Sequence, residues 1–230
     1  MCGRFVSFST TDEIQRHFGV EKVRTEQVQP NYNAAPTQQI AVVFQESGQR
    51  VLDRMQWGLV PFWAEDPSIG NRMINARSET VAEKPSFKAA FRQRRCLIVN
   101  DGFFEWTGPK GNRQPMFIKP EGETGPFAFA GLWEFWKPKE EPEATPLTSC
   151  TILTMDAAES IQQIHNRMPV MLKPGAYEVW LDPAGIDPGD LERIVSTQVY
   201  SMFEAIPVSQ AVNSPDRNDP SLLEPVPGMR

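Results

Sequence analysis

The chain has 230 residues and a net charge of −6 at pH 7. Its length and a hydrophobic content of 40% allow one large domain with a core, and the negative charge excludes capture of nucleic acid by bulk positive charge. The sequence has neither an apolar run of about 18 residues nor a signal peptide, so we expect a cytoplasmic protein with no membrane partner. Three cysteines without metal-binding spacing predict reduced thiols, and we expect no metal and no cofactor.

The first predicted element in chain order is a helix after Thr10, because helix caps precede apolar residues at helical spacing. Apolar runs then predict a pair of strands at residues 40–44 and 51–57. We expect a helix over residues 78–94, interrupted at Pro85. The remaining predicted elements are strands at residues 96–99, 115–118, 127–133 and 150–155, and helices at residues 158–165 and 188–198.

Strands dominate the middle of the chain and helices flank them, without regular βαβ alternation. This order predicts a single α+β domain with a twisted antiparallel, barrel-like β core flanked by helices. Trp57, Cys96 and Cys150 lie in the apolar runs and are expected in the core. Residues 138–146 are acidic and rich in proline, which predicts an exposed loop.

Cys2 has a chemistry that an internal cysteine lacks. If Met1 is removed, Cys2 carries a free α-amine beside its thiol, whereas an internal cysteine has only a planar amide nitrogen. An amine and a thiol on adjacent carbons can both add to one aldehyde and close a five-membered ring. The alternative is an ordinary cysteine near a frayed chain end, and position alone does not decide between the two.

Three further residues are candidates for chemistry. Asn75 precedes a predicted helix, so its amide either orients a substrate or caps that helix. Glu105 stands among aromatic residues, where burial favours proton exchange near neutral pH, and an edge-strand glutamate in solvent is the alternative. His165 ends a predicted helix and is either structural or a proton shuttle. Together with Cys2 these residues supply an amine and thiol, an amide, a carboxylate and an imidazole.

Aromatic and basic residues offer a way to hold a nucleic acid strand. Phe62, Trp63 and Trp106 could stack on unpaired bases, although aromatic residues are more often part of a core. Arginines near these segments allow a local basic groove on an acidic protein, and scattered solvated arginines are the alternative.

These segments resemble the SOS response-associated peptidase family, known as the SRAP domain. The matching motifs follow one another in the family's order from Cys2 to about Asn213. They are residues 1–5, 33–37, 57–63, 75–80, 95–98, 102–106, 129–134, 165–169, 208–209 and 212–213. Departures are small: Val99 stands where proline is common, and Phe104 where tyrosine is common.

The resemblance implies covalent capture of abasic sites in single-stranded DNA, through a thiazolidine on Cys2 after removal of Met1. The resemblance also implies that Asn75, Glu105 and His165 take part in this reaction. The resemblance also implies a domain at residues 1–213 with a tail at 214–230, and a monomer that is nucleoid-associated when bound to DNA. The residues expected to bind DNA are Arg4, Arg77, Arg167, Phe62, Trp63 and Trp106.

Two other classes of function stay open from the sequence. One is a cysteine peptidase or N-terminal-nucleophile hydrolase, in which Cys2 attacks a carbonyl and His165 is the base. Such a hydrolase could act only on its own N-terminus. The other is a noncatalytic reader of modified or single-stranded DNA, in which the arginines and aromatic residues matter and Cys2 is incidental.

Overall fold

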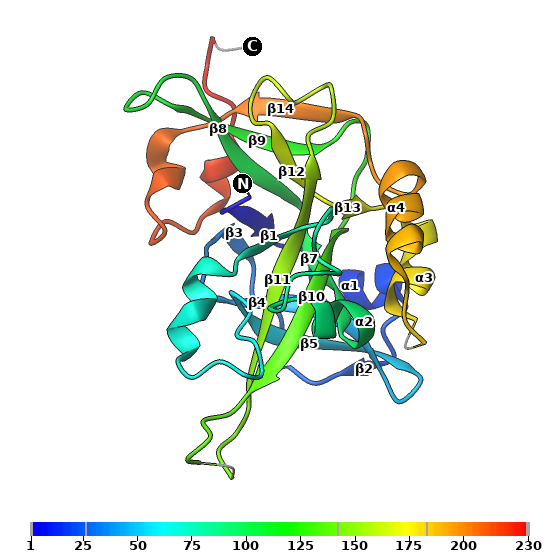
Figure 1. The fold of residues 1–230 in the computed structure, drawn as a ribbon. Coiled ribbons are helices and arrows are strands. Elements are labelled where there is room, and N and C mark those ends of the chain that lie inside the picture. Colours follow the sequence, from blue (N-terminus) through cyan, green and yellow to red (C-terminus); the bar gives the residue numbers. More distant parts are fainter. Residues whose placement is uncertain (1, 26, 142, 183, 229–230) are drawn as a thin grey trace.

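A computed structural model describes residues 2–25, 27–141, 143–182 and 184–228. In these ranges the strands form two sheets (Figure 1). The smaller sheet has the strand order β14 (Phe203–Pro207), β9 (Gln114–Pro120), β8 (Gly102–Thr107), β1 (Phe5–Ser7) and β3 (Asn31–Ala34). The larger has the order β12 (Arg167–Pro169), β11 (Leu147–Asp156), β10 (Phe127–Trp136), β7 (Arg95–Asn100), β4 (Gln39–Glu46), β5 (Gln49–Trp57) and β2 (Lys22–Val23).

Two short strands extend the larger sheet, and helices accompany it. β13 (Met171–Leu172) pairs with β10, and β6 (Asn75–Arg77) pairs with β11. The α-helices are α1 (Thr11–Phe18), α2 (Lys88–Gln93), α3 (Tyr177–Leu181) and α4 (Pro188–Thr197). The 3-10 helices are η1 (Pro67–Arg72), η2 (Pro174–Ala176), η3 (Gln210–Asn213) and η4 (Pro220–Leu223). In the described residues, no helix has the length and apolar character that crossing a bilayer requires.

The larger sheet closes on itself. β5 pairs with β4 on one side and with β11 on the other, so β4, β5, β11, β10 and β7 follow one another around a ring. Only two residue pairs, Ser149–Gln56 and Cys150–Trp57, make the closing contact, so this is a ring of strands rather than a regular barrel. The prediction of an α+β domain with a closed β core is confirmed. The long pairings are antiparallel, as predicted, and only the short β5–β11, β6–β11 and β2–β5 pairings among the named strands are parallel.

The ring is buried on both faces. In β7, Leu97 and Val99 join the cluster that contains residues of all four α-helices, whereas Cys96 and Ile98 join a second cluster. The second cluster contains residues of the smaller sheet and Cys2. Figure 1 shows the helices on the right of the ring and the smaller sheet at its upper left. The ring therefore separates a helix-covered core from the core beneath the N-terminus.

Helix α1 forms where its sequence signals predicted. Thr10 accepts the Glu13 amide and Glu13 reaches back to the Thr10 amide, which completes a capping box. Ile14 and Phe18 are the buried residues, and Gly19 ends the helix in the left-handed conformation. The local pattern and the tertiary burial agree here, which is why the prediction is confirmed.

Of the predicted helices, the one over residues 78–94 is shorter than expected and the one over residues 158–165 is wrong. Only α2 is helical within residues 78–94, because Pro85 lacks an amide hydrogen and the preceding segment forms turns. Residues 158–165 form turns, in which the Ile161 and Gln162 amides both donate to the Ala158 carbonyl. The apolar spacing there instead places Ile161 and Ile164 against the cluster beneath Cys2.

Gly102 positions the strand that carries Glu105, and we expect Gly102→Ala to destabilise the fold by about 2 kcal/mol. Its φ is 138°, and an added Cβ would lie 2.5 Å from the Phe117 ring and 2.9 Å from the Ile118 carbonyl oxygen. Gly48→Ala is the matched control, because Gly48 also has a positive φ but faces open space. Urea unfolding of both variants measures the difference, and equal losses would contradict a packing role for Gly102.

Candidate functional site

Cys2 lies just before β1, over the core between the ring and the smaller sheet. Its side chain is fully buried, above a group of rings in which Phe5 contacts Trp57 and Phe129. Burial, together with the charge of Glu105, raises the pKa of the Cys2 thiol well above its usual range. The thiol is therefore protonated at neutral pH, and a reaction through sulfur requires a group that accepts its proton.

Asn75 holds the backbone of Cys2. Its Nδ2 donates a 2.9 Å hydrogen bond to the Cys2 carbonyl oxygen, across 73 positions of sequence. Asn75 is the first residue of β6, where it pairs with Ile152 of β11, so the helix-cap alternative is wrong. Its Oδ1 is buried and has no hydrogen-bond partner among the described residues. That oxygen is an acceptor available to a ligand that reaches Cys2.

Glu105 lies beside the N-terminal segment because β8 pairs with β1. The register joins Phe5 to Phe103, and the Phe104 amide donates to the Arg4 carbonyl, which brings Glu105 next to the start of the chain. Glu105 is only 5% exposed, and β8 is an interior strand with β9 on its other side. The alternative of a solvated edge-strand glutamate is therefore wrong. A buried carboxylate close to the Cys2 thiol is a candidate for proton exchange.

His165 is ordered by the strand that follows it. The Arg167 amide donates to His165 Nδ1 at 2.9 Å, and the same nitrogen lies 3.1 Å from the Arg167 carbonyl oxygen, so the backbone of Arg167 holds the ring in place. The neighbouring Ile164 and Met168 pack on the same cluster as Cys2. β12 and β6 both pair with the C-terminal part of β11, so the structure brings the segments of His165 and Asn75 to one region.

The three arginines that the sequence singled out have different surroundings. Arg4 Nη1 donates to Asn33 Oδ1 at 2.7 Å and to the Val212 carbonyl at 2.9 Å, and partial burial lowers the pKa of Arg4. Arg77 is exposed at the end of β6. Arg167 donates to carboxylates of Glu79 and Asp156. Arg77 therefore has its head group in solvent, whereas Arg4 and Arg167 are already engaged within the chain.

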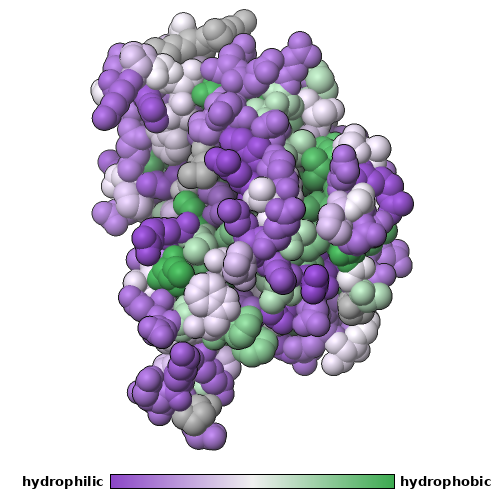
Figure 2. Space-filling view, viewed as in Figure 1, coloured by the Kyte–Doolittle hydropathy of each residue, from purple (hydrophilic) through white to green (hydrophobic). Residues whose placement is uncertain are grey.

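The aromatic candidates fall into two places. Phe62 and Trp63 are 56% and 42% exposed in the segment after β5, which Trp136 anchors by donating from Nε1 to the Ala64 carbonyl. Trp106 follows Glu105, is half-buried, and lines a cavity of about 480 Å³ with Arg113 and other residues. The face shown in Figure 2 is mostly hydrophilic, with small hydrophobic areas.

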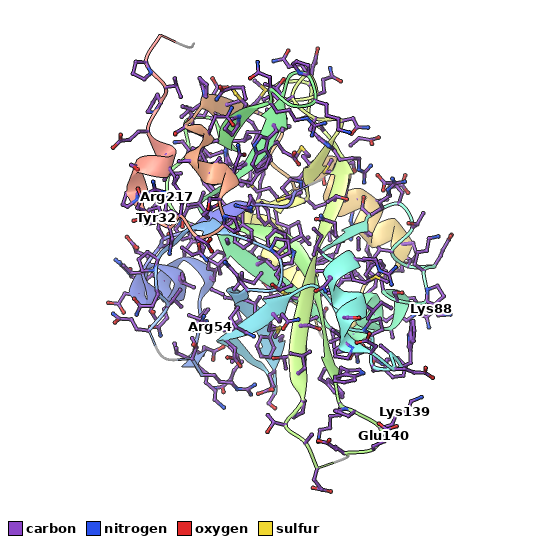
Figure 3. The ribbon with its side chains drawn as sticks, turned by 90° about the vertical axis from the view of Figure 1, so that its left-hand side faces the viewer. Tyr32, Arg54, Lys88, Lys139, Glu140 and Arg217 are labelled. Atoms are coloured by element: carbon purple, nitrogen blue, oxygen red, sulfur yellow. The ribbon has the colours of Figure 1, made fainter. Side chains whose placement is uncertain are left out.

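Two asparagines of the site carried no role in the sequence reasoning. Asn33 is buried and donates from Nδ2 to the carbonyls of Val212, Ser214 and Arg217, while its Oδ1 accepts from Arg4. Asn213 Oδ1 accepts from the Trp106 indole at 2.8 Å. Both lie in motifs of the resemblance, but only the fold shows that they join residues 212–217 to the site. Figure 3 shows Arg217 beside Tyr32, the neighbour of Asn33.

The arrangement combines nucleophiles with groups that move protons. Cys2 supplies a thiol, Asn75 fixes its carbonyl, Glu105 lies within electrostatic reach, and His165 contributes an imidazole held by the Arg167 backbone. Among the described residues, no group of three or more metal-ligating side chains could hold a metal ion. This set fits addition to a carbonyl carbon with internal proton transfer.

The fold and these motifs define a single class of protein. The chain belongs to the SOS response associated peptidase (SRAP) family, whose model matches residues 1–215. It is 42% identical to the abasic site processing protein YoqW of Bacillus subtilis, over 97% of this chain and 99% of that protein. It is 33% identical to the abasic site processing protein HMCES of Gallus gallus, over 90% of this chain and 69% of that protein.

Solved structures share the fold. A crystal structure of a protein from Bacteroides thetaiotaomicron matches with a TM-score of 0.84 and 22% identity, covering 98% of this chain and all of that one. A phage-related protein from Bordetella bronchiseptica matches with a TM-score of 0.70 and 26% identity, covering 91% of this chain and 95% of that one. The family resemblance read from the motifs is thereby confirmed.

Proposed function

We propose that this protein processes abasic sites in DNA, as its relatives YoqW and HMCES are named for doing, by covalent capture in single-stranded DNA. Cys2, freed of Met1, forms a thiazolidine with the lesion. The observation that carries the proposal is the hydrogen bond from Asn75 Nδ2 to the Cys2 carbonyl. It fixes the backbone of Cys2, so that an amine and a thiol are presented together at a site with a buried carboxylate.

The reaction has two additions. An abasic deoxyribose is partly an open-chain aldehyde, and the Cys2 amine attacks its C1′ and releases one water to form an imine. The S–H bond then adds across the imine, with sulfur bonding to C1′ and the proton going to nitrogen. Nitrogen attacks first, because only the amine can form the imine to which the S–H bond then adds. Holding both nucleophiles at C1′ supplies a high effective concentration.

Neighbouring residues manage the protons. Glu105 exchanges the proton that the thiol gives up, and also serves the reverse reaction. The His165 imidazole gives a proton to the sugar ring oxygen as the ring opens. Asn75 orients the amine through the Cys2 carbonyl. One chain supplies all four residues, so the proposed reaction runs in a monomer.

The strand is held by contacts that do not read sequence. Arg4, Arg77 and Arg167 contact phosphates, and Phe62, Trp63 and Trp106 stack on unpaired bases. Single-stranded DNA is the substrate because the sugar must lie outside a duplex stack to reach Cys2. The net charge of −6 confines this binding to a narrow groove.

A covalent product tests the proposal. The protein with Met1 removed is incubated with single-stranded DNA carrying one abasic site, and products are examined by denaturing gel and intact mass. We expect one adduct whose mass is the sum of both partners less one water, and which borohydride does not reduce. A variant with an uncleaved residue before Cys2 is the control and should form none. Reversible binding alone, or turnover of a peptide substrate without an adduct, would overturn the proposal.

A cysteine peptidase is less compatible with this site. Such enzymes rely on a thiolate whose pKa is lowered by a charged neighbour, whereas burial and the Glu105 charge raise the pKa of the Cys2 thiol. Amine-first attack on an aldehyde does not need a thiolate in the free protein.

We expect Glu105→Gln to slow adduct formation by about a hundredfold, because it removes the proposed proton carrier. The noncovalent affinity for the same DNA, measured in a Cys2→Ala background, should stay within about twofold of the parent. Single-turnover kinetics on denaturing gels give the rate. If Glu105→Gln formed the adduct at the parental rate at every pH, the role of proton carrier would be contradicted. If the variant also lost noncovalent binding, the role of Glu105 would be structural.

A further inference from the structure

The terminal nitrogens of Arg167, Nη1 and Nη2, have no unused donor in the free protein. Nη1 donates to Glu79 Oε1 at 2.6 Å and to Asp156 Oδ1 at 2.7 Å. Nη2 donates to Glu79 Oε2 at 2.9 Å and to the Thr154 carbonyl at 2.7 Å. Nε is buried and has no hydrogen-bond partner among the described residues. A DNA phosphate can therefore reach the guanidinium only by replacing one of these acceptors.

The two carboxylates differ in how firmly they hold Arg167. Glu79 binds both terminal nitrogens in a bidentate arrangement, and its side chain is 48% exposed. Asp156 contributes one oxygen to Nη1, and its side chain is 89% exposed. The Arg167 side chain is mostly buried, so the exposure is on the Asp156 side, and a carboxylate held by one hydrogen bond is held weakly where water competes for it. Asp156 is the acceptor that an incoming anion replaces.

Charge around the pair favours this exchange. Burial opposes ionisation of Glu79, but its hydrogen bond from Arg167 and the charges of Arg167 and Arg77 outweigh this and lower the pKa of Glu79. Glu79 therefore stays ionised and keeps the guanidinium oriented. Arg77 pairs with Thr154 in the β6–β11 register, and its charge acts on Glu79, so a second cation lies within electrostatic reach of the Arg167 ion pair.

We propose that Asp156 occupies the place of a DNA phosphate oxygen on Arg167, and that this competition limits the affinity of the protein for undamaged single-stranded DNA. The inference rests on the proposed function, because it concerns the strand that the same site captures. In this arrangement Glu79 is a positioning residue that orients the Arg167 guanidinium, and Asp156 is the carboxylate that the phosphate displaces. Weak binding to an intact strand lets the protein leave it, whereas the covalent bond retains an abasic strand without help from this contact.

Asp156→Asn tests the competition directly. In a Cys2→Ala background, binding of a short fluorescein-labelled oligothymidine is followed by anisotropy over about 0.05 to 0.2 M salt. We expect Asp156→Asn to tighten binding about threefold at low salt, since the neutral side chain competes less well with phosphate. The plot of log affinity against log salt should steepen by about 0.7, which corresponds to one more phosphate contact on a single strand. Glu79→Gln should weaken binding, because the guanidinium loses its bidentate partner.

The matched control is Glu46→Gln. Glu46 is an exposed carboxylate paired with Arg24 at the β4–β5 turn, and the substitution changes the net charge by the same amount. An equal gain in Glu46→Gln would show a bulk charge effect and overturn the inference. The inference would also be overturned if Asp156→Asn left DNA binding unchanged while the protein with Cys2 intact still formed its adduct. Failure of both adduct and binding would overturn the proposed function as well.

Discussion

Cys2→Ala is expected to abolish the adduct with abasic DNA, with a loss of about a thousandfold or more in rate. Alanine keeps the α-amine but lacks the sulfur that closes the ring. Any imine that forms stays open, and it acidifies the neighbouring sugar carbon and favours strand cleavage. Denaturing gels should show cleaved DNA in place of the stable adduct.

Cys2→Ser separates the two nucleophiles. Serine keeps the amine and places a poorer nucleophile where sulfur was, so we expect a borohydride-reducible imine and little stable product. Cys96→Ala is the control, because Cys96 is equally buried in the same cluster yet lies in β7 within the ring. It should retain the adduct. A stable adduct in Cys2→Ala, or its loss in Cys96→Ala with the fold intact, would contradict the assignment to Cys2.

Much of the fold was predictable from local patterns, but the strands around Glu105 were not. The apolar runs of β4, β7 and β10 are continuous because both faces of the ring are buried, so they stand out in the sequence. β8 is less obvious, since Glu105 and Trp106 interrupt it. Its place between β1 and β9 depends on pairing with residues 5 and 6, nearly a hundred positions earlier. No local window carries that information.

The sequence identified which residues could take part in the chemistry, but it did not predict where they lie relative to one another. Asn75 precedes what looked like a helix, yet it begins a strand that pairs with Ile152 far along the chain. The Arg167 partners come from two elements, Glu79 after β6 and Asp156 at the end of β11. Glu79 lies in the motif at residues 75–80, but only the fold shows that its partner is Arg167.

Arg95→Met is expected to lower the free energy of unfolding by about 4 kcal/mol. Arg95 is 4% exposed, and its guanidinium has backbone carbonyls as acceptors. It donates to Phe91 and Arg92 in the last turn of α2, and to Trp180 and Asp182 at the end of α3. These carbonyls have no donor partner within their own short helices, so one cation in β7 caps both helices.

Burial lowers the pKa of Arg95, which shows that holding the charge there has a cost that the four carbonyls offset. Methionine fills much of the volume but leaves the buried carbonyls of Phe91 and Trp180 without this donor, each costing about 1–3 kcal/mol with incomplete additivity. Arg92→Met is the control, since its side chain is exposed in the same helix and should change stability by less than about 0.5 kcal/mol. Urea unfolding followed by far-UV circular dichroism measures both. A loss in Arg95→Met no larger than the control would mean that water satisfies these carbonyls, and that the two helices hold to the ring by apolar packing alone.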